Sequence, residues 1–146
     1  MIFEDRTYSS NHFVTHQGAI FRKQHLDNVS YDVSLSLPKG QFYYGTVAVH
    51  FDLLKMPSQA KPVYLDFRGV QIGSFKINGV ALENKEGDKQ SIFDKHEIVI
   101  PSESLKLGKN ELTMDILNKY RKDGVGLHSF VDAVDKEQYL YTQFEA

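Results

Sequence analysis

The segment from Asn28 to Leu37 alternates strictly between apolar and polar residues, and no other pattern in the chain constrains the fold as strongly. A β-strand points successive side chains to opposite faces of its sheet, so this period of two predicts a strand. The apolar phase holds Val29, Tyr31, Val33, Leu35 and Leu37, and the polar phase holds Ser30, Asp32, Ser34 and Ser36. We therefore predict a strand with one face buried in a core and one face in water.

Turn signals divide the rest of the chain into further short strands. Pro38-Lys39-Gly40 predicts a turn, and the alternation around residues 47–53 predicts the second strand of an antiparallel hairpin. Asn78-Gly79 is the strongest short hairpin signal, because both residues tolerate a positive φ. Gly108-Lys109-Asn110 is predicted to be a turn before a strand over residues 112–116. More strands are predicted at residues 63–67 and 98–100, and on both sides of a turn at residues 132–136.

These signals predict an all-β fold, with about eight short strands in an antiparallel β-sandwich or saddle. One short helix is expected near the N-terminus, at residues 9–26, where Phe13, Val14, Ile20 and Phe21 share one face. Residues 83–90 are expected to form a solvated loop. Neither a linker nor a repeat divides the sequence, so residues 1–146 are predicted to form a single domain.

Composition excludes several classes of function. The formal net charge of −2 argues against nucleic acid or an anionic membrane as a partner. Without cysteine, the chain has neither a disulfide nor a thiolate nucleophile. Residues 1–6 do not resemble a signal peptide, and no apolar run is long enough for a membrane-spanning helix. We therefore expect a cytoplasmic location.

The candidate chemical motifs in the body of the chain are weak. His12 and His16 lie four residues apart, which could place two metal ligands on one helical face. Phe13 occupies the position of the general-base Glu in an HExxH zinc-peptidase motif, so we interpret the pair as surface histidines. Gly124-Val125-Gly126 lacks the strand and helix of a phosphate-binding loop. The basic residues at 119–122 are interpreted as a solvated loop.

The last strand carries a Gln and a Glu in the same phase. Gln143 and Glu145 are two residues apart, so in a strand they would project to the same side. A carboxylate in this position could accept charge-assisted hydrogen bonds from an ammonium group. From the pattern alone, we interpret this segment as an exposed strand end.

Residues 124–145, which read GVGLHSFVDAVDKEQYLYTQFE, closely resemble the end of the N-terminal domain of the aminopeptidase N family. This family comprises zinc-dependent aminopeptidases, and its pattern runs roughly GxGLHxFxDPxD followed by YLYTQFE. Ala133 replaces the usual proline, which affects only the rigidity of the turn. Residues 28–53, 77–79 and 107–112 are similar to the family's opening hairpin and later turns.

The resemblance implies a saddle-shaped β-sandwich that packs on a separate, thermolysin-like catalytic domain. That domain would supply the zinc and the catalytic residues, so this chain would hold neither and would be inactive alone. Gln143 and Glu145 would bind substrate: the Glu would take the free α-ammonium group of a peptide, and the Gln would shape the first-residue pocket. Phe144 would serve in packing. The alternative is a stand-alone, non-catalytic β-sandwich that acts as a protein-interaction module.

Overall fold

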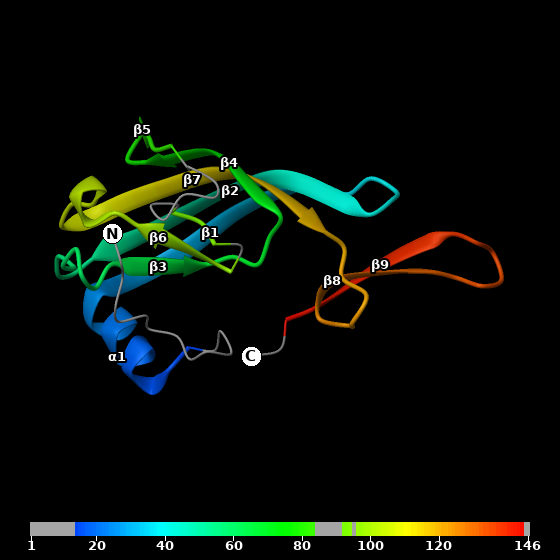
Figure 1. The fold of residues 1–146 in the computed structure, drawn as a ribbon, viewed down its shortest axis with the longest axis horizontal. Helices are drawn as coiled ribbons and strands as arrows, with labels where there is room; N and C mark the ends of the chain where they lie inside the picture. Colours follow the sequence, from blue (N-terminus) through cyan, green and yellow to red (C-terminus); the bar gives the residue numbers. More distant parts are fainter. Residues whose placement is uncertain (1–13, 84–91, 95, 145–146) are drawn as a thin grey trace.

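The computed structural model describes residues 14–83, 92–94 and 96–144, and it confirms a mostly β fold (Figure 1). One helix, α1, opens the described chain, and nine strands follow it within these residues. The elements are α1 His16–His25, β1 Leu26–Ser36, β2 Phe42–Leu53, β3 Val63–Asp66, β4 Gln71–Ile77, β5 Val80–Ala81, β6 Glu97–Ile100, β7 Gly108–Lys119, β8 Gly126–Val131 and β9 Gln138–Gln143.

The strands form three antiparallel sheets. The largest has five strands in the order β1-β2-β7-β4-β5, while β3 pairs with β6 and β8 pairs with β9. In Figure 1 the β8–β9 hairpin extends away from the other two sheets. The body is therefore a two-layer β structure, and the hairpin is an arm attached to one end of it.

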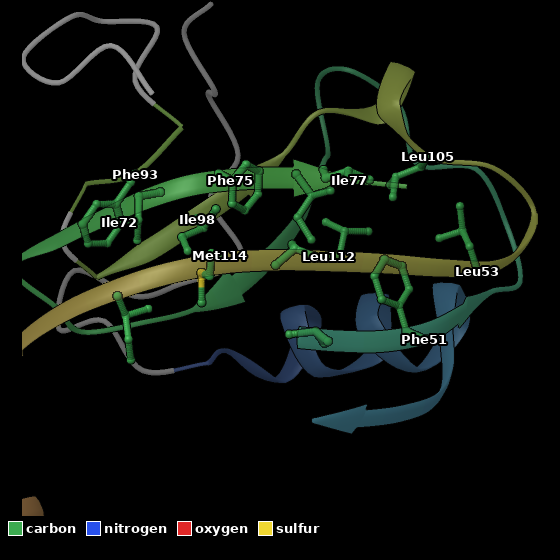
Figure 2. Close-up of a cluster of buried hydrophobic side chains, with 14 residues drawn as sticks. Phe51, Leu53, Ile72, Phe75, Ile77, Phe93, Ile98, Leu105, Leu112 and Met114 are labelled. Carbon is green, nitrogen blue, oxygen red and sulfur yellow. The ribbon is translucent and has the colours of Figure 1, made fainter. Parts of the chain in front are cut away.

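The core lies between the five-stranded sheet and the β3–β6 pair (Figure 2). Leu112 of β7 and Ile98 of β6 are fully buried, and they come from opposite layers. The inward-facing residues of β2, β4 and β7 alternate with polar residues, as a sheet with one wet face requires. The buried apolar cluster consists of Val49, Phe51, Leu53, Val63, Ile72, Phe75, Ile77, Phe93, Ile98, Ile100, Leu105, Leu112, Met114 and Ile116.

The Asn78-Gly79 hairpin forms as predicted. Ile77 pairs with Val80, and the two residues between them have φ values of 51° and 81°. These paired positive values belong to the tight turn that matches the twist of an antiparallel hairpin. The Asn78 side chain also donates to Asn110 Oδ1 at 3.0 Å, which ties the turn to the start of β7.

The prediction that one face of the first strand is buried is wrong. Every residue of β1 from Asp27 to Ser36 is exposed, including Tyr31 at 55% and Val33 at 56%. Tyr31 lies beside Val49 and Val33 beside Val47, so the apolar phase does face the core side of the sheet. The β3–β6 layer covers β2 and β7 but does not extend over β1. A pocket of about 270 Å³ opens there, between β1 and β3.

The helix is shorter in the described residues than the sequence predicts. It runs from His16 to His25, and residues 9–13 of the predicted segment lie outside the described residues. Thr15 caps it by accepting a hydrogen bond from the Gly18 amide, which explains the start at His16. No helix in the described part of the chain is long and apolar enough to span a membrane.

The predicted turn at residues 108–110 is also wrong, because these residues are already the first part of β7. Gly108 pairs with Leu53 and Asn110 with Phe51. Asn110 is buried, and its amide bonds to the carbonyls of Lys106 and Gly108 at 2.7 and 2.8 Å. The turn therefore lies before Gly108, and the Asn110 side chain closes it. No local sequence pattern predicts this role of Asn110. The predicted loop at residues 83–90 lies, beyond residue 83, outside the described residues.

Candidate functional site

The candidate site lies on the β8–β9 hairpin, which is formed by the segment that resembles the aminopeptidase N family. Its two strands pair antiparallel from Gly126↔Gln143 to Val131↔Gln138, close to the predicted limits. Side chains alternate between the two faces of such a ladder. Gln143 therefore shares a face with the residues at 128, 130, 139 and 141.

That face is a row of aromatic side chains. His128 lies opposite Tyr141, and Phe130 lies opposite Tyr139. Their ring centroids are 4.7 and 5.5 Å apart, within the range of favourable aromatic pairs. Phe130, Tyr139 and Tyr141 are each more than 40% exposed. This aromatic face, defined as His128, Phe130, Tyr139 and Tyr141, leads directly to Gln143.

Gln143 is the last residue of β9, and its cross-strand neighbour is a glycine. Since Gly126 has no side chain, the position directly opposite Gln143 on this face carries none. Glu145 lies outside the described residues, so its predicted position beside Gln143 stays a prediction. Phe144 is 81% exposed, so its expected packing role is not met by the described residues and stays a prediction.

The other face of the hairpin attaches it to the body. Ser129 is fully buried, and its hydroxyl accepts a hydrogen bond from Gln138 Nε2 at 2.7 Å. Gln138 also bonds both backbone groups of Gly40, at 2.7 and 2.9 Å, in the turn between β1 and β2. Tyr120 is buried nearby and donates to the carbonyl of Pro38 at 2.8 Å. The hairpin is therefore attached to the body through Ser129 and Gln138 on one face, and it carries the exposed aromatic row on the other.

The segment after β7 provides a short parallel neighbour for β8. The Arg121 amide donates to the Leu127 carbonyl, and the Ser129 amide donates to the Arg121 carbonyl, both at 2.9 Å. The Arg121 guanidinium forms an ion pair with Asp123, and this contact holds the pKa of the Asp123 carboxyl well below its usual range. The Gly124 amide donates to His128 Nδ1 at 2.9 Å, so the ring nitrogen facing it acts as the acceptor.

The basic residues at 119–122 make contacts within the fold. Lys122 donates to the Ser129 carbonyl at 2.8 Å, and Lys119 lies 5.4 Å from the centre of the Phe42 ring. With Arg121 paired to Asp123, all three cations have partners within the chain. The interpretation of residues 119–122 as a solvated loop is therefore only partly right, because Lys119 ends β7 and Tyr120 is buried.

The turn of the hairpin is closed by side chains. Asp132 Oδ1 accepts from the Val134 amide at 2.6 Å, and Lys136 has a φ of 62°. The Tyr139 hydroxyl donates to the Asp135 carboxylate at 2.6 Å. This bond lowers the pKa of Asp135 and raises the pKa of Tyr139. It fixes one end of the aromatic face although Ala133 stands where the family has proline.

The histidines do not form a metal centre within the described residues. His12 lies outside them, and His16 is exposed at the start of α1. His25 is buried, bonds the Phe21 carbonyl at 2.8 Å and stacks on the Phe21 ring. His50 lies between two carboxylates at 3.2 and 3.5 Å, on the outer face of the sheet. Among the residues that the structure describes, no three His, Asp or Glu side chains could hold a metal ion. The described residues therefore offer no ligand set for the zinc that the resemblance implies for the family.

The aromatic face is what the sequence reading missed. A spacing of two residues, in His128-x-Phe130 and Tyr139-x-Tyr141-x-Gln143, was the available signal. Only the register of the hairpin shows that these two runs lie opposite each other on one face.

The fold and the site together define a β-sandwich module with an aromatic arm whose outer face is open. Over 119 residues, or 80% of its length, the chain is 33% identical to aminopeptidase N from Streptomyces lividans. The chain is thus homologous to a portion of aminopeptidase N, which confirms the resemblance predicted from the sequence. It spans 13% of the length of that relative. No protein-family model matches the chain.

Proposed function

We propose that this chain is the N-terminal domain of a zinc aminopeptidase, in which it binds the free amino end of the substrate. The observation that carries the proposal is the homology to aminopeptidase N together with the position of Gln143 at the end of an open aromatic face. The zinc and the catalytic residues would lie in a separate domain. This chain would bind and orient the substrate, and the separate domain would carry out the chemistry.

Glu145 would accept hydrogen bonds from the α-ammonium group of a peptide, and Gln143 would line the pocket for the first residue. A charge-assisted bond of this kind contributes about 1.5–3 kcal/mol when water is excluded. Holding the amino end at a fixed place also sets which peptide bond reaches the catalytic centre. On the isolated chain the same contact would contribute little, because water screens an exposed charge.

The aromatic face would supply the surface that packs on the catalytic domain. Phe130, Tyr139 and Tyr141 are each more than 40% exposed on this face, whereas Ser129 and Gln138 attach the opposite face to the body. Aromatic residues are enriched at protein interfaces of this kind. Packing there would exclude water from the space around Gln143 and strengthen its contacts with substrate. A cytoplasmic location stays a prediction from the sequence.

Two experiments test the proposal. The first reads the gene beyond codon 146: an HExxH motif in the following few hundred codons is expected, while a stop codon would support the stand-alone interaction module instead. The second measures kcat/KM of the whole enzyme on peptides with free and acetylated N-termini. Glu145→Ala should lower kcat/KM for free peptides roughly 10- to 150-fold, as a loss of 1.5–3 kcal/mol requires.

The control variant is Glu103→Ala, which removes a carboxylate from the short 3-10 helix Ser102–Ser104 and should leave kcat/KM unchanged. An unchanged kcat/KM for Glu145→Ala would remove Glu145 from the site. The chain alone should not hydrolyse aminoacyl fluorogenic substrates, and chelator-sensitive turnover by it would overturn the proposal that catalysis lies in another domain.

A further inference from the structure

The loop of residues 123–126 leads into β8 and ends opposite Gln143. Gly124 and Gly126 have φ values of 83° and 68°, which lie in the left-handed region that glycine adopts readily. Gly126 is the first residue of β8 and the cross-strand partner of Gln143. The position of this loop therefore bears directly on the space beside Gln143.

The ring of His128 lies against both the loop and β9. The Gly124 amide donates to His128 Nδ1 at 2.9 Å, so this nitrogen is the acceptor of a neutral imidazole. The centroids of the His128 and Tyr141 rings are 4.7 Å apart. A Cβ added at Gly124 would lie 3.5 Å from the Tyr141 hydroxyl, so the loop also runs close to Tyr141. His128 thus links the loop to the aromatic face.

The register places this link beside the residue proposed to bind substrate. His128 pairs with Tyr141, and the next pair on the same face is Gly126 with Gln143, about 7 Å along the strands. We propose that His128 is a positioning residue, which fixes the loop of residues 123–126 as one wall of the first-residue pocket. This inference rests on the proposed function, in which Gln143 lines that pocket.

The contacts of the loop show why this histidine matters. Asp123 accepts from the Val125 amide at 3.3 Å and pairs with Arg121, and both contacts lie within residues 121–125. They shape the loop locally, whereas the bond from Gly124 to His128 ties it to β8. Glycine loses more conformational freedom on ordering than any other residue, so a loop with two glycines is costly to hold in place. The His128 ring offsets part of that cost.

A fixed wall would discriminate among substrates by the side chain of their first residue. A leucine side chain extends farther from the amino end than the methyl group of alanine, so its binding depends more on where the wall lies. One methylene in a hydrophobic pocket changes kcat/KM by roughly 10- to 200-fold. Freeing the loop would shift the wall without removing it, so a smaller change of about 3- to 10-fold is expected.

Two substitutions of His128 isolate the hydrogen bond. In His128→Asn, Oδ1 is as many bonds from the backbone as Nδ1 is in histidine, so it can accept from the Gly124 amide. In His128→Gln the acceptor lies one bond farther out. Both variants lack the ring, so the loss of its stacking on Tyr141 is common to them.

The measurement is kcat/KM of the whole enzyme on aminoacyl fluorogenic substrates of leucine and of alanine. The leucine-to-alanine ratio does not depend on the fraction of enzyme that is folded, so a merely structural role of His128 would leave it unchanged. His128→Gln should lower the ratio about 3- to 10-fold, and His128→Asn should stay within about twofold of the wild type. The loss should lie in KM of the leucine substrate, because the wall contacts the first residue in the ground state and the transition state alike.

The matched control is His50→Gln, since His50 lies on β2, on the outer face of the five-stranded sheet. It should leave the ratio unchanged. Hydrogen exchange of the whole enzyme, read by mass spectrometry on overlapping peptides, gives a second measurement that needs no activity. The Gly124 amide should be protected in the wild type and in His128→Asn, and it should exchange faster in His128→Gln.

Equal leucine-to-alanine ratios for His128→Asn and His128→Gln would overturn this inference, as would an unprotected Gly124 amide in the wild type. If Glu145→Ala lowers kcat/KM while the two His128 variants share one ratio, this inference alone fails and the proposed function stands. If Glu145→Ala leaves kcat/KM unchanged and the ratios are equal as well, both fail.

Discussion

Gly126 lies directly opposite Gln143 in the β8–β9 hairpin, and its φ is 68°. The glycine thus provides a left-handed backbone at the start of β8 and places no side chain directly opposite Gln143. An L-residue in this conformation costs roughly 1–2 kcal/mol. A Cβ at this position would also lie 3.4 Å from Cδ of Arg121. That distance is ordinary van der Waals contact, so Gly126→Ala should lower the free energy of unfolding, as measured by urea denaturation, by the backbone cost of about 1–2 kcal/mol.

Gly79→Ala is the matched control for this substitution. Its φ is 81°, but nothing lies within 4 Å of an added Cβ, so the variant bears the backbone cost without the contact to Arg121. The two variants should lose similar stability, because each bears the same backbone cost, and a much larger loss for Gly126→Ala would show that the contact with Arg121 is strained.

Gln138 holds the hairpin against the body, so Gln138→Ala should loosen β8 and β9 selectively. The variant removes two hydrogen bonds to Gly40 and one to the buried Ser129. A loss of about 1–3 kcal/mol is expected. Hydrogen exchange should speed up at β8 and β9 amides, whereas amides of β7 should keep their protection. Gln138→Glu retains the acceptor for the Gly40 amide, so its exchange rates at β8 and β9 should lie between those of the wild type and of Gln138→Ala. Uniformly faster exchange in all strands would show that Gln138 does not stabilise the hairpin selectively.

Asn110 closes the approach to β7, so Asn110→Ala should destabilise the whole sheet. Its side chain has four hydrogen-bond contacts with Asn78, Lys106 and Gly108, and it is only 4% exposed. Groups left without partners in a buried site cost about 1–3 kcal/mol each. A double-mutant cycle with Asn78→Ala should give a coupling energy of roughly 0.5–3 kcal/mol. Additive effects in urea unfolding would show that the Asn78–Asn110 bond is not a structural link.

Asp123 should make the stability of the chain fall in acid. Pairing with Arg121 lowers the pKa of Asp123 in the folded state below its ordinary value of 3.8. The folded state then binds the proton less well than the unfolded state, so the pair stabilises the fold above about pH 4. That contribution is lost as the pH falls from about 4 through the folded pKa.

Urea unfolding of the wild type and Asp123→Asn at pH 7 and at acid pH checks this sign. The difference in stability should be constant near neutrality and should shrink below about pH 4. Tyr139→Phe is a useful comparison, since it removes the bond that lowers the pKa of Asp135 and should weaken the acid response in the same direction. A difference that grows in acid would contradict the assignment.

Local sequence was sufficient where the physical cause is local. Asn78-Gly79 allows two successive positive φ values, and the alternation of β2 and β7 follows from the geometry of a strand, so these elements were predictable. The hairpin at residues 126–143 was found because its turn and both strands are adjacent in the chain. Gln143 could be placed on a strand for the same reason, while Glu145 lies outside the described residues.

Only the tertiary structure decided which of these surfaces are covered. The alternation of β1 correctly identifies the side that faces the core, but a second layer has to reach that side for it to be buried, and β3 and β6 do not extend that far. The aromatic face likewise needed the register of two paired strands, which sets Phe130 opposite Tyr139 and His128 opposite Tyr141. A period in the sequence specifies the direction of side chains within one strand. What lies opposite them depends on contacts between distant segments, which no local pattern encodes.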